Sequence, residues 1–278
     1  MSTKFRHAKS LGQNFLTDRS IVDEIIAGSL IGNDDFVIEI GPGMGVLTQE
    51  LADIAAKVVA IEIDTRLIPI LNKKFASYDN VEFINEDVMK CNINEIIADH
   101  RTKNCKSVRI VGNLPYYITT PIVMKLLEEK VEAESITVMI QKEVADRIVA
   151  EPGSKACGAI TASAAYYCET ERITEAPASA FEPRPKVDST VIRLDVRSAP
   201  PVELLEEESY FEVVKYGFAQ RRKTLLNALT GMRGMDKAAV GAALESAGVD
   251  AKRRAETLSI DELAAVANAV VALQRTAR

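Results

Sequence analysis

A glycine-rich turn is the first feature of this sequence whose residue types could do chemistry. The segment EIGPGMG (residues 39–45) follows an apolar, β-branched run and precedes a segment with helical periodicity. Glycines at such a turn let the backbone approach a ligand closely, and the N-terminus of the next helix offers unpaired N–H groups. The GxGxG spacing departs from the GxGxxG of dinucleotide-binding folds. Taken alone, the turn is equally explained as a connection between a strand and a helix.

Two carboxylates narrow this interpretation. Glu62 ends the next predicted strand, where an acid can bind both hydroxyls of a ribose, and Asp87 ends the strand after that, close to where an adenine ring would lie. Either acid alone is as well explained by helix capping. A glycine turn and two acids at three successive strand ends together predict an adenosine pocket at the carboxyl edge of a parallel sheet.

The segment NLPY (residues 113–116) follows the fourth predicted strand and suits chemistry on an adenine amine. This exocyclic amine is a poor nucleophile because its lone pair is delocalised into the ring. The side-chain oxygen of Asn113 and the backbone carbonyl of Leu114 or Pro115 can accept hydrogen bonds from the two N–H groups of the amine. These bonds would direct the lone pair toward a sulfonium methyl group. Tyr116 can stack on a base taken out of its helix. Because the amine is neutral and the donor cationic, positioning and electrostatics would supply the catalysis. An isolated segment of this kind is also explained as a loop turn with a packed tyrosine.

An α/β fold must position these residues. Between residues 20 and 150, short apolar runs alternate with segments of helical periodicity, which predicts a parallel sheet covered by helices. The predicted helices include residues 45–55 and 119–129, the second beginning with a threonine cap and a proline in its first turn. The predicted strands are FVIEI (36–40), KVVAIEI (57–63), VEFINED (81–87), VRIVGN (108–113) and SITVMIQ (135–141).

The last third of the chain changes character. A loop at residues 151–157 and two strand-like runs, at 171–176 and 189–196, precede a proline pair and an acidic stretch that mark a boundary near residue 200. Beyond it only helical periodicity remains. We therefore predict an α/β domain over residues 1–199 and a small all-helical domain over residues 200–278. The predicted helical segments are 210–220, 223–232, 237–248 and 260–273.

The charge is unevenly distributed. A net charge of −6 argues against nucleic acid if it is taken alone, but the distribution of Lys and Arg matters more than their sum. Each basic stretch could be a solvated face; beside an adenosine pocket, all three become candidate RNA contacts. The three stretches contain Lys4, Arg6, Lys9 and Arg19; Lys215, Arg221, Arg222 and Lys223; and Lys252, Arg253 and Arg254.

Composition bounds the class of protein. With 47% hydrophobic residues the chain can bury a substantial core. The four cysteines form no CxxC pair and have no histidine at metal-ligand spacing, so we expect reduced thiols, no disulfide and no metal site. No apolar run reaches the roughly 18 residues of a membrane span, and the N-terminal segment lacks the apolar core of a signal peptide. A cytoplasmic monomer without a membrane anchor is the expectation.

These ordered motifs resemble the KsgA family of small-subunit ribosomal RNA adenine dimethyltransferases. Beside the glycine turn, the two acids and NLPY, three further segments match that family, and together the motifs cover nearly the whole chain. The further segments are LGQNFL (11–16), FEPRPKVDS (181–189) and FAQRRKTL (218–225).

The resemblance implies a Rossmann-like class I methyltransferase domain with a mostly parallel sheet, a helical C-terminal domain that binds RNA, and S-adenosylmethionine as cofactor. Its implied substrate is two adjacent adenosines in a loop near the 3′ end of small-subunit RNA, each dimethylated within an assembling ribosomal particle. The implied cofactor-binding residues are Gln13, Asn14, Leu16, Gly41, Gly43, Glu62, Ile63, Asp87, Val88 and Asn113. The implied catalytic residues are Asn113, Leu114, Pro115, Tyr116 and Phe181, the last against the second face of the base, and the implied RNA contacts are Arg221, Arg222 and Lys223.

Other functions share part of this pattern. Macrolide-resistance methyltransferases, which act on large-subunit RNA, share the GQNFL-like, glycine, NLPY-like and FxPxP motifs, so the catalytic half does not exclude them. The FAQRRKTLLNAL segment (218–229) favours the small-subunit family. A DNA adenine methyltransferase would need a sequence-reading module that is not evident, and a dehydrogenase is disfavoured by the GxGxG spacing. An assembly factor with vestigial catalysis is disfavoured by the intact Asn113, Tyr116 and Glu62.

Overall fold

The computed structural model describes residues 13–276. The first two residues of the LGQNFL motif and the basic residues Lys4, Arg6 and Lys9 lie outside the described residues. The chain divides into two compact units. Among the described residues, one unit comprises residues 13–145 and 170–196, and the other comprises residues 146–169 and 197–276.

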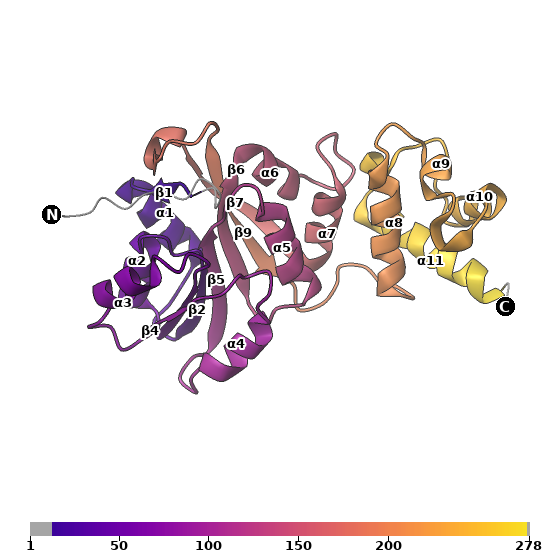
Figure 1. Cartoon of the computed structure of the whole chain (residues 1–278). Coiled ribbons are helices and arrows are strands. Elements are labelled where there is room, and N and C mark those ends of the chain that lie inside the picture. The colour runs from indigo at the N-terminus through magenta and orange to yellow at the C-terminus, as the bar shows by residue number, and fades with distance from the viewer. Residues whose placement is uncertain (1–12, 277–278) are drawn as a thin grey trace. The chain divides into compact units, whose positions relative to one another are not determined.

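The first unit is built on a seven-stranded sheet of order β4-β3-β2-β5-β6-β9-β7 (Figure 1). The strands from β4 to β6 pair in parallel, and β9 runs antiparallel to β6. This mostly parallel sheet confirms the predicted α/β fold. The strands are β2 (Asp35–Ile40), β3 (Lys57–Ile61), β4 (Val81–Ile84), β5 (Ser107–Asn113), β6 (Ser135–Gln141), β7 (Cys168–Ala176) and β9 (Ser189–Val196).

All seven strands coincide with runs that the sequence predicts as strands. Every residue of β2 is buried, as expected of a strand covered on both faces. Two strands end earlier than predicted: Glu62 follows β3 directly, and Asp87 lies three residues beyond the end of β4. Both acids therefore stand on loops at the carboxyl edge of the sheet.

Helices cover both faces of the sheet (Figure 1). Side chains of α1 and α2 form one continuous core with those of β2, β3, β5, β6 and β9, and Leu51 of α2 is fully buried there. The helix predicted after the glycine turn is confirmed as α2. One face carries α1 (Arg19–Ser29), α2 (Val46–Ile54) and α3 (Ile68–Lys74), and the other carries α4 (Ile93–His100) and α5 (Thr119–Glu128).

The start of α5 corrects one prediction. The residue at its N-cap is Ile118, which has no capping side chain, so the predicted threonine cap is wrong. Thr119 is already helical, and its hydroxyl donates to the carbonyl of Pro115 at 3.1 Å. The hydroxyl therefore ties the helix to the NLPY segment instead of capping it.

Short elements connect the N-terminal segment to the sheet. The strand β1 (Phe15–Leu16) pairs antiparallel with β8 (Phe181–Glu182), so that Leu16 lies opposite Phe181. The one-turn helix η2 (Ala178–Ala180) precedes β8, and α6 (Lys142–Ile148) follows β6. The described part of the N-terminal segment is thus anchored to a loop more than a hundred residues away.

The second unit is helical, as the sequence predicts. Its core joins α7 to the C-terminal helices: the hydroxyl of Tyr210 donates to the carbonyl of Ala162 at 3.1 Å, and the rings of Tyr166 and Tyr210 stack. Contacts thus place residues 146–169 in this unit, whereas the boundary predicted near residue 200 leaves them in the first domain. The helices are α7 (Ala159–Tyr167), α8 (Glu207–Ala219), α9 (Leu225–Leu229), η3 (Met232–Gly234), α10 (Lys237–Ser246), η4 (Ala255–Thr257) and α11 (Ile260–Thr276).

Truncation of one buried leucine tests the role of α2 in this core. We expect Leu51→Ala to lower the free energy of unfolding of the first unit by about 2–5 kcal/mol, because it removes buried methyl groups and leaves a cavity. Leu30→Ala is the matched control, since this leucine is 57% exposed and should change stability by no more than about 0.5 kcal/mol. Chemical denaturation would measure both, and equal effects would contradict the packing described.

Candidate active site

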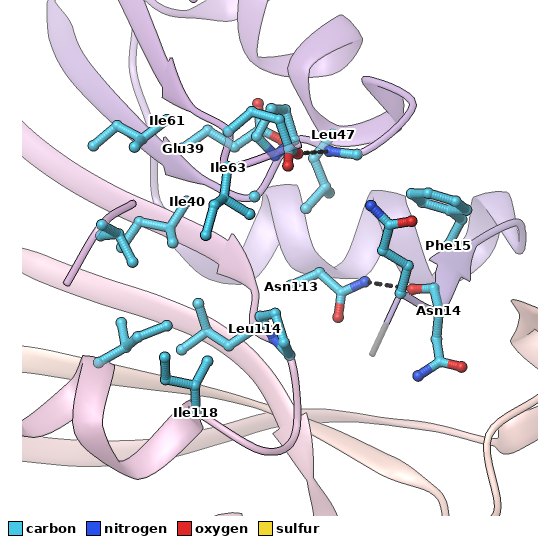
Figure 2. A pocket seen from close by; sticks show the side chains of 18 of the residues that line it. Asn14, Phe15, Glu39, Ile40, Leu47, Ile61, Ile63, Asn113, Leu114 and Ile118 are labelled. Atoms are coloured by element: carbon cyan, nitrogen blue, oxygen red, sulfur yellow. Dashed lines mark hydrogen bonds between the residues drawn. The ribbon is translucent and has the colours of Figure 1, made fainter. Parts of the chain in front are cut away.

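A cavity of about 350 Å³ lies at the carboxyl ends of the parallel strands (Figure 2). Its walls come from residues 13–16, the glycine turn, the ends of β3 and β5, and the loop after β4. It brings together all ten predicted cofactor-binding residues and four of the five predicted catalytic residues. These are Gln13, Asn14, Leu16, Gly41, Gly43, Glu62, Ile63, Asp87, Val88, Asn113, Leu114, Pro115 and Tyr116.

Strand register explains why distant residues meet at this edge. Ile40 at the end of β2 pairs with Ile61 of β3 on one side and with Gly112 of β5 on the other. The next residues along the three strands are Gly41, Glu62 and Asn113. In parallel pairing, equal steps along neighbouring strands keep residues at the same level. The turn, the acid and the amide therefore line one cavity.

The glycine turn needs its glycines for two separate reasons. Gly43 and Gly45 have positive φ values of 57° and 72°, a conformation that strains other residues. A Cβ atom would also lie 2.8 Å from the ring of Phe15 at Gly43 and 2.7 Å from the ring of Phe75 at Gly45. The ammonium of Lys74 donates to the carbonyls of Met44 and Gly45 at 3.0 and 2.9 Å. The rings of Phe15 and Phe75 therefore leave no room for a side chain at Gly43 and Gly45, and Lys74 holds the backbone of the turn.

Two acids face the cavity with part of their acceptor capacity in use. Glu62 is buried, and its two oxygens accept the N–H groups of Gly43 at 3.2 Å and Asp64 at 2.8 Å. Burial raises the pKa of Glu62. Asp87 accepts the N–H of Met89 at 3.0 Å through one oxygen. A carboxylate offers about four acceptor positions, so both acids retain capacity for hydroxyl or amine donors.

Glu39 is a site residue whose role sequence reasoning missed. It lines the cavity near the end of β2 (Figure 2). Its side chain is 1% exposed and accepts a hydrogen bond from the hydroxyl of Thr48 at 2.6 Å. Burial raises the pKa of Glu39 to about 7, and the charge of Glu62 acts in the same direction. An acid at the first position of EIGPGMG, inside an otherwise apolar strand, was the available signal.

Residues 13–16 connect the two sides of the cavity. The amide of Gln13 donates to Asp64 at 2.9 Å, on the side of the acids. The backbone carbonyl of Asn14 accepts from the side-chain amide of Asn113 at 3.1 Å, on the opposite side (Figure 2). Asp64 also pairs with Arg66 at 2.6 Å, and this hydrogen bond lowers the pKa of Asp64 to about 2. This ionised acid was not predicted, although it follows Glu62 closely in the sequence.

The contact with Asn14 orients the side chain of Asn113. Its nitrogen donates to the Asn14 carbonyl, so its oxygen is the atom left to accept hydrogen bonds from a ligand. This is the orientation that the predicted contact with an adenine amine needs.

Hydrogen bonding also distinguishes the two predicted carbonyl acceptors, those of Leu114 and Pro115. The Pro115 carbonyl already accepts the N–H of Ile118 at 3.1 Å and the hydroxyl of Thr119 at 3.1 Å. A carbonyl oxygen has two lone pairs, so this group is saturated. The Leu114 carbonyl is therefore the better acceptor for a bound amine.

Tyr116 is held at the cavity by a partner outside the NLPY segment. Its hydroxyl and that of Ser189 form a hydrogen bond of 2.7 Å, and burial raises the pKa of Tyr116. Ser189 was not predicted as a site residue, although it ends the FEPRPKVDS segment. The bond fixes the ring at its outer end.

Phe181 is the predicted catalytic residue that the structure does not bring to the cavity. Its side chain is 3% exposed and packs in the core between the sheet and its helices, where β8 pairs with β1. Successive side chains of a strand point to opposite faces, and here Phe181 takes the buried face while Glu182 is exposed. Its position makes it a support for Leu16, which does line the cavity.

The predicted RNA contacts lie in the second unit, on the loop between α8 and α9. Arg221, Arg222 and Lys223 are exposed there, and within residues 13–276 their side chains form no ion pair. The N–H of Leu225 donates to the carbonyl of Arg253 at 2.7 Å. This bond brings the third basic stretch, residues 252–254, beside the loop.

No group of three or more His, Cys, Asp or Glu side chains among residues 13–276 could hold a metal ion. No helix in that range is long and apolar enough to cross a membrane.

Comparison with known proteins agrees with this geometry. The fold and the cavity define a class I methyltransferase. A model of the ribosomal RNA adenine dimethylase family matches residues 4–271, and the chain belongs to this family. The chain is 50% identical over 266 residues to the ribosomal RNA small subunit methyltransferase A of Clostridioides difficile, covering 96% of this chain and 91% of that protein. It is 51% identical over 272 residues to the protein of the same name from Alkaliphilus metalliredigens, covering 98% and 94%.

Solved structures show the same fold. A dimethyladenosine transferase from Plasmodium falciparum superposes with a TM-score of 0.77 at 24% identity, over 91% of this chain and 95% of that one. The 23S rRNA methyltransferase ErmE superposes with a TM-score of 0.70 at 29% identity, over 93% and 100%. These likenesses confirm the predicted class I methyltransferase fold.

The buried acid Glu39 predicts a pH dependence of stability. Its pKa is about 7 in the folded chain and near 4.5 when exposed, so its contribution to stability is complete below about pH 4.5 and is lost as the pH rises through 7. The contribution is on the order of 3 kcal/mol. We expect Glu39→Gln to reduce the fall in the free energy of unfolding between these pH values.

Unfolding experiments at several pH values would measure this difference. Glu24→Gln is the control, because Glu24 is exposed on α1 and outside the cavity. An unchanged pH profile in Glu39→Gln would show that Glu39 is ionised throughout this range.

Proposed function

We propose that this chain dimethylates the exocyclic N6 amines of two adjacent adenosines in a loop near the 3′ end of small-subunit ribosomal RNA, with S-adenosylmethionine as methyl donor. The observation that carries the proposal is the orientation of Asn113 in a chain of this family: its nitrogen is bonded to Asn14, and its oxygen is left to accept from an amine. The chain is about 50% identical to proteins named as small-subunit methyltransferases, and this identity supports small-subunit RNA as the substrate.

The residues at the acidic side of the cavity fit the cofactor. Glu62 and Asp87 retain acceptor capacity for the ribose hydroxyls and the adenine amine. Ile63, which is 47% exposed, and the buried Val88 both line the cavity, so they offer apolar contact to an adenine ring. The glycine turn allows the methionine portion to approach the backbone. When bound, S-adenosylmethionine supplies a methyl group attached to a cationic sulfur. A neutral amine can attack the carbon of this methyl group.

The opposite side of the cavity would hold the target base. The Asn113 oxygen and the Leu114 carbonyl accept hydrogen bonds from the two N–H groups of the adenine amine. These bonds concentrate the lone pair on the nitrogen and aim it across the cavity. Tyr116, fixed through Ser189, stacks on the base. Because each acceptor is held before the base arrives, little reorganisation accompanies the reaction. Phe181 contributes by supporting Leu16 from the core.

Two comparisons bear on the choice between ribosomal subunits. The chain is 29% identical to ErmE, which acts on 23S rRNA by its name, and about 50% identical to proteins named for the small subunit. The large-subunit alternative is therefore less well supported.

We propose further that the helical C-terminal domain, residues 200–278, contacts RNA within an assembling particle, and that the protein acts as a cytoplasmic monomer.

Methyl transfer to defined substrates tests the proposed function. The purified protein is incubated with methyl-labelled S-adenosylmethionine and undermethylated small-subunit particles, with large-subunit RNA and duplex DNA in parallel, and nucleosides are identified by mass spectrometry. We expect dimethyladenosine from the small-subunit sample alone. Asn113→Ala is expected to lower kcat by roughly 10²- to 10³-fold, because it removes a preorganised acceptor.

Other outcomes would contradict the proposal in distinct ways. Label in large-subunit RNA would transfer the assignment to that subunit. Cofactor binding without any product would indicate an assembly factor without turnover. Wild-type kcat in Asn113→Ala would leave the mechanism without its main acceptor.

The basic loop of the second unit gives a separate prediction. Arg221→Glu combined with Arg222→Glu should weaken binding of the small-subunit particle and lower its salt slope by roughly one to two, because fewer counterions are released from RNA phosphates. Binding at several salt concentrations would measure the slope. A matched double reversal, Lys73→Glu with Lys103→Glu, places the same charge change on exposed residues of the first unit and should have less effect. Loss of cofactor binding in the first variant would indicate misfolding instead.

A further inference from the structure

Tyr117 lines the cavity, yet most of its ring is uncovered. It is 61% exposed, the most exposed of the large hydrophobic side chains that border the cavity. Within residues 13–276, no hydrogen bond, ion pair or aromatic contact involves this ring. Neither the resemblance nor the comparisons assign it a role.

The backbone around Tyr117 is held on both sides. Tyr116 is bonded through its hydroxyl to Ser189, and the N–H of Ile118 donates to Pro115. The helix α5 follows directly and is tied back to the loop by Thr119. The uncovered ring is therefore presented from an ordered loop next to the groups that would hold the target base.

An uncovered aromatic ring at the border of a binding cavity is suited to stacking. A tyrosine offers a large flat contact area with few rotatable bonds, so little conformational entropy is lost when a ligand covers it. Every nucleobase has a π-face, and stacking on aromatic side chains stabilises single-stranded RNA without hydrogen-bond readout. The ring thus matches an unpaired base in chemistry.

We infer that Tyr117 stacks on the base adjacent to the target adenosine and positions the RNA strand at the cavity. This inference rests on the proposed function. When one adenine enters the cavity, its neighbour is one backbone unit away and must lie near the cavity border. Tyr116 and Tyr117 then hold consecutive bases, the first inside and the second outside. Because stacking tolerates any base, the same ring can serve while either of the two adjacent adenosines is the target.

Substitutions at Tyr117 test this positioning role. We expect Tyr117→Ala to raise KM for undermethylated small-subunit particles by roughly five- to fifty-fold, because it removes one base–aromatic stack. The effect on kcat should be much smaller, and the Kd for S-adenosylmethionine should stay within twofold of wild type. Tyr117→Phe keeps the ring and should retain most of the wild-type KM. Ile70→Ala, at an exposed apolar residue of α3 outside the cavity, is the control for truncation.

A direct readout of stacking accompanies the kinetics. Particles carrying the fluorescent base 2-aminopurine beside the target adenosine should change their emission on binding the wild type and Tyr117→Phe, and much less on binding Tyr117→Ala. Wild-type KM and emission in Tyr117→Ala would overturn the inference alone. A wild-type protein that produces no dimethyladenosine would overturn the proposed function, and the inference with it.

Discussion

The active site depends on the parallel register of β2 with β3 and β5. Because Ile40 lies opposite both Ile61 and Gly112, the residue after each strand reaches the same edge of the sheet. A shift of one residue in either pairing would turn the side chains of that strand to the other face. Burial on both faces of β2 makes such a shift unfavourable, so the hydrophobic core and the alignment of the site have one cause.

Desolvated acids give this cavity a preference among nucleotide ligands. Glu39 and Glu62 are both buried beside the glycine turn, and burial raises the pKa of each. A ligand with positive charge compensates buried carboxylates, whereas the pyrophosphate of a dinucleotide would add like charge to them. Electrostatics therefore favours a sulfonium cofactor over a dinucleotide, because the surroundings of the turn are acidic.

The regular elements of this chain could be predicted because their patterns are local. Strands β6 and β9 have the bounds that their apolar runs predict, and α2 begins directly after the glycine turn. Prediction failed where a side chain had two possible partners. Thr119 could cap a helix or bond back to the preceding loop, and the carbonyl of Pro115 decided the outcome. The second failure is the boundary predicted near residue 200, which assigns residues 146–169 to the first domain. The helix α7 in this segment buries its side chains against α8 instead.

The sequence by itself determined the site residues of three motifs whose spacing reflects local backbone geometry: the glycine turn, the acids after the strands and NLPY. Only the tertiary structure decided what each residue contacts. It bonded Asn113 to Asn14, saturated the carbonyl of Pro115, and placed Phe181 in the core while leaving Tyr117 uncovered at the cavity. These outcomes depend on the packing of segments that lie far apart in the sequence, such as Asn14 with Asn113 and Leu16 with Phe181. Hydrogen-bond saturation and burial are properties of that packing, which no local pattern contains.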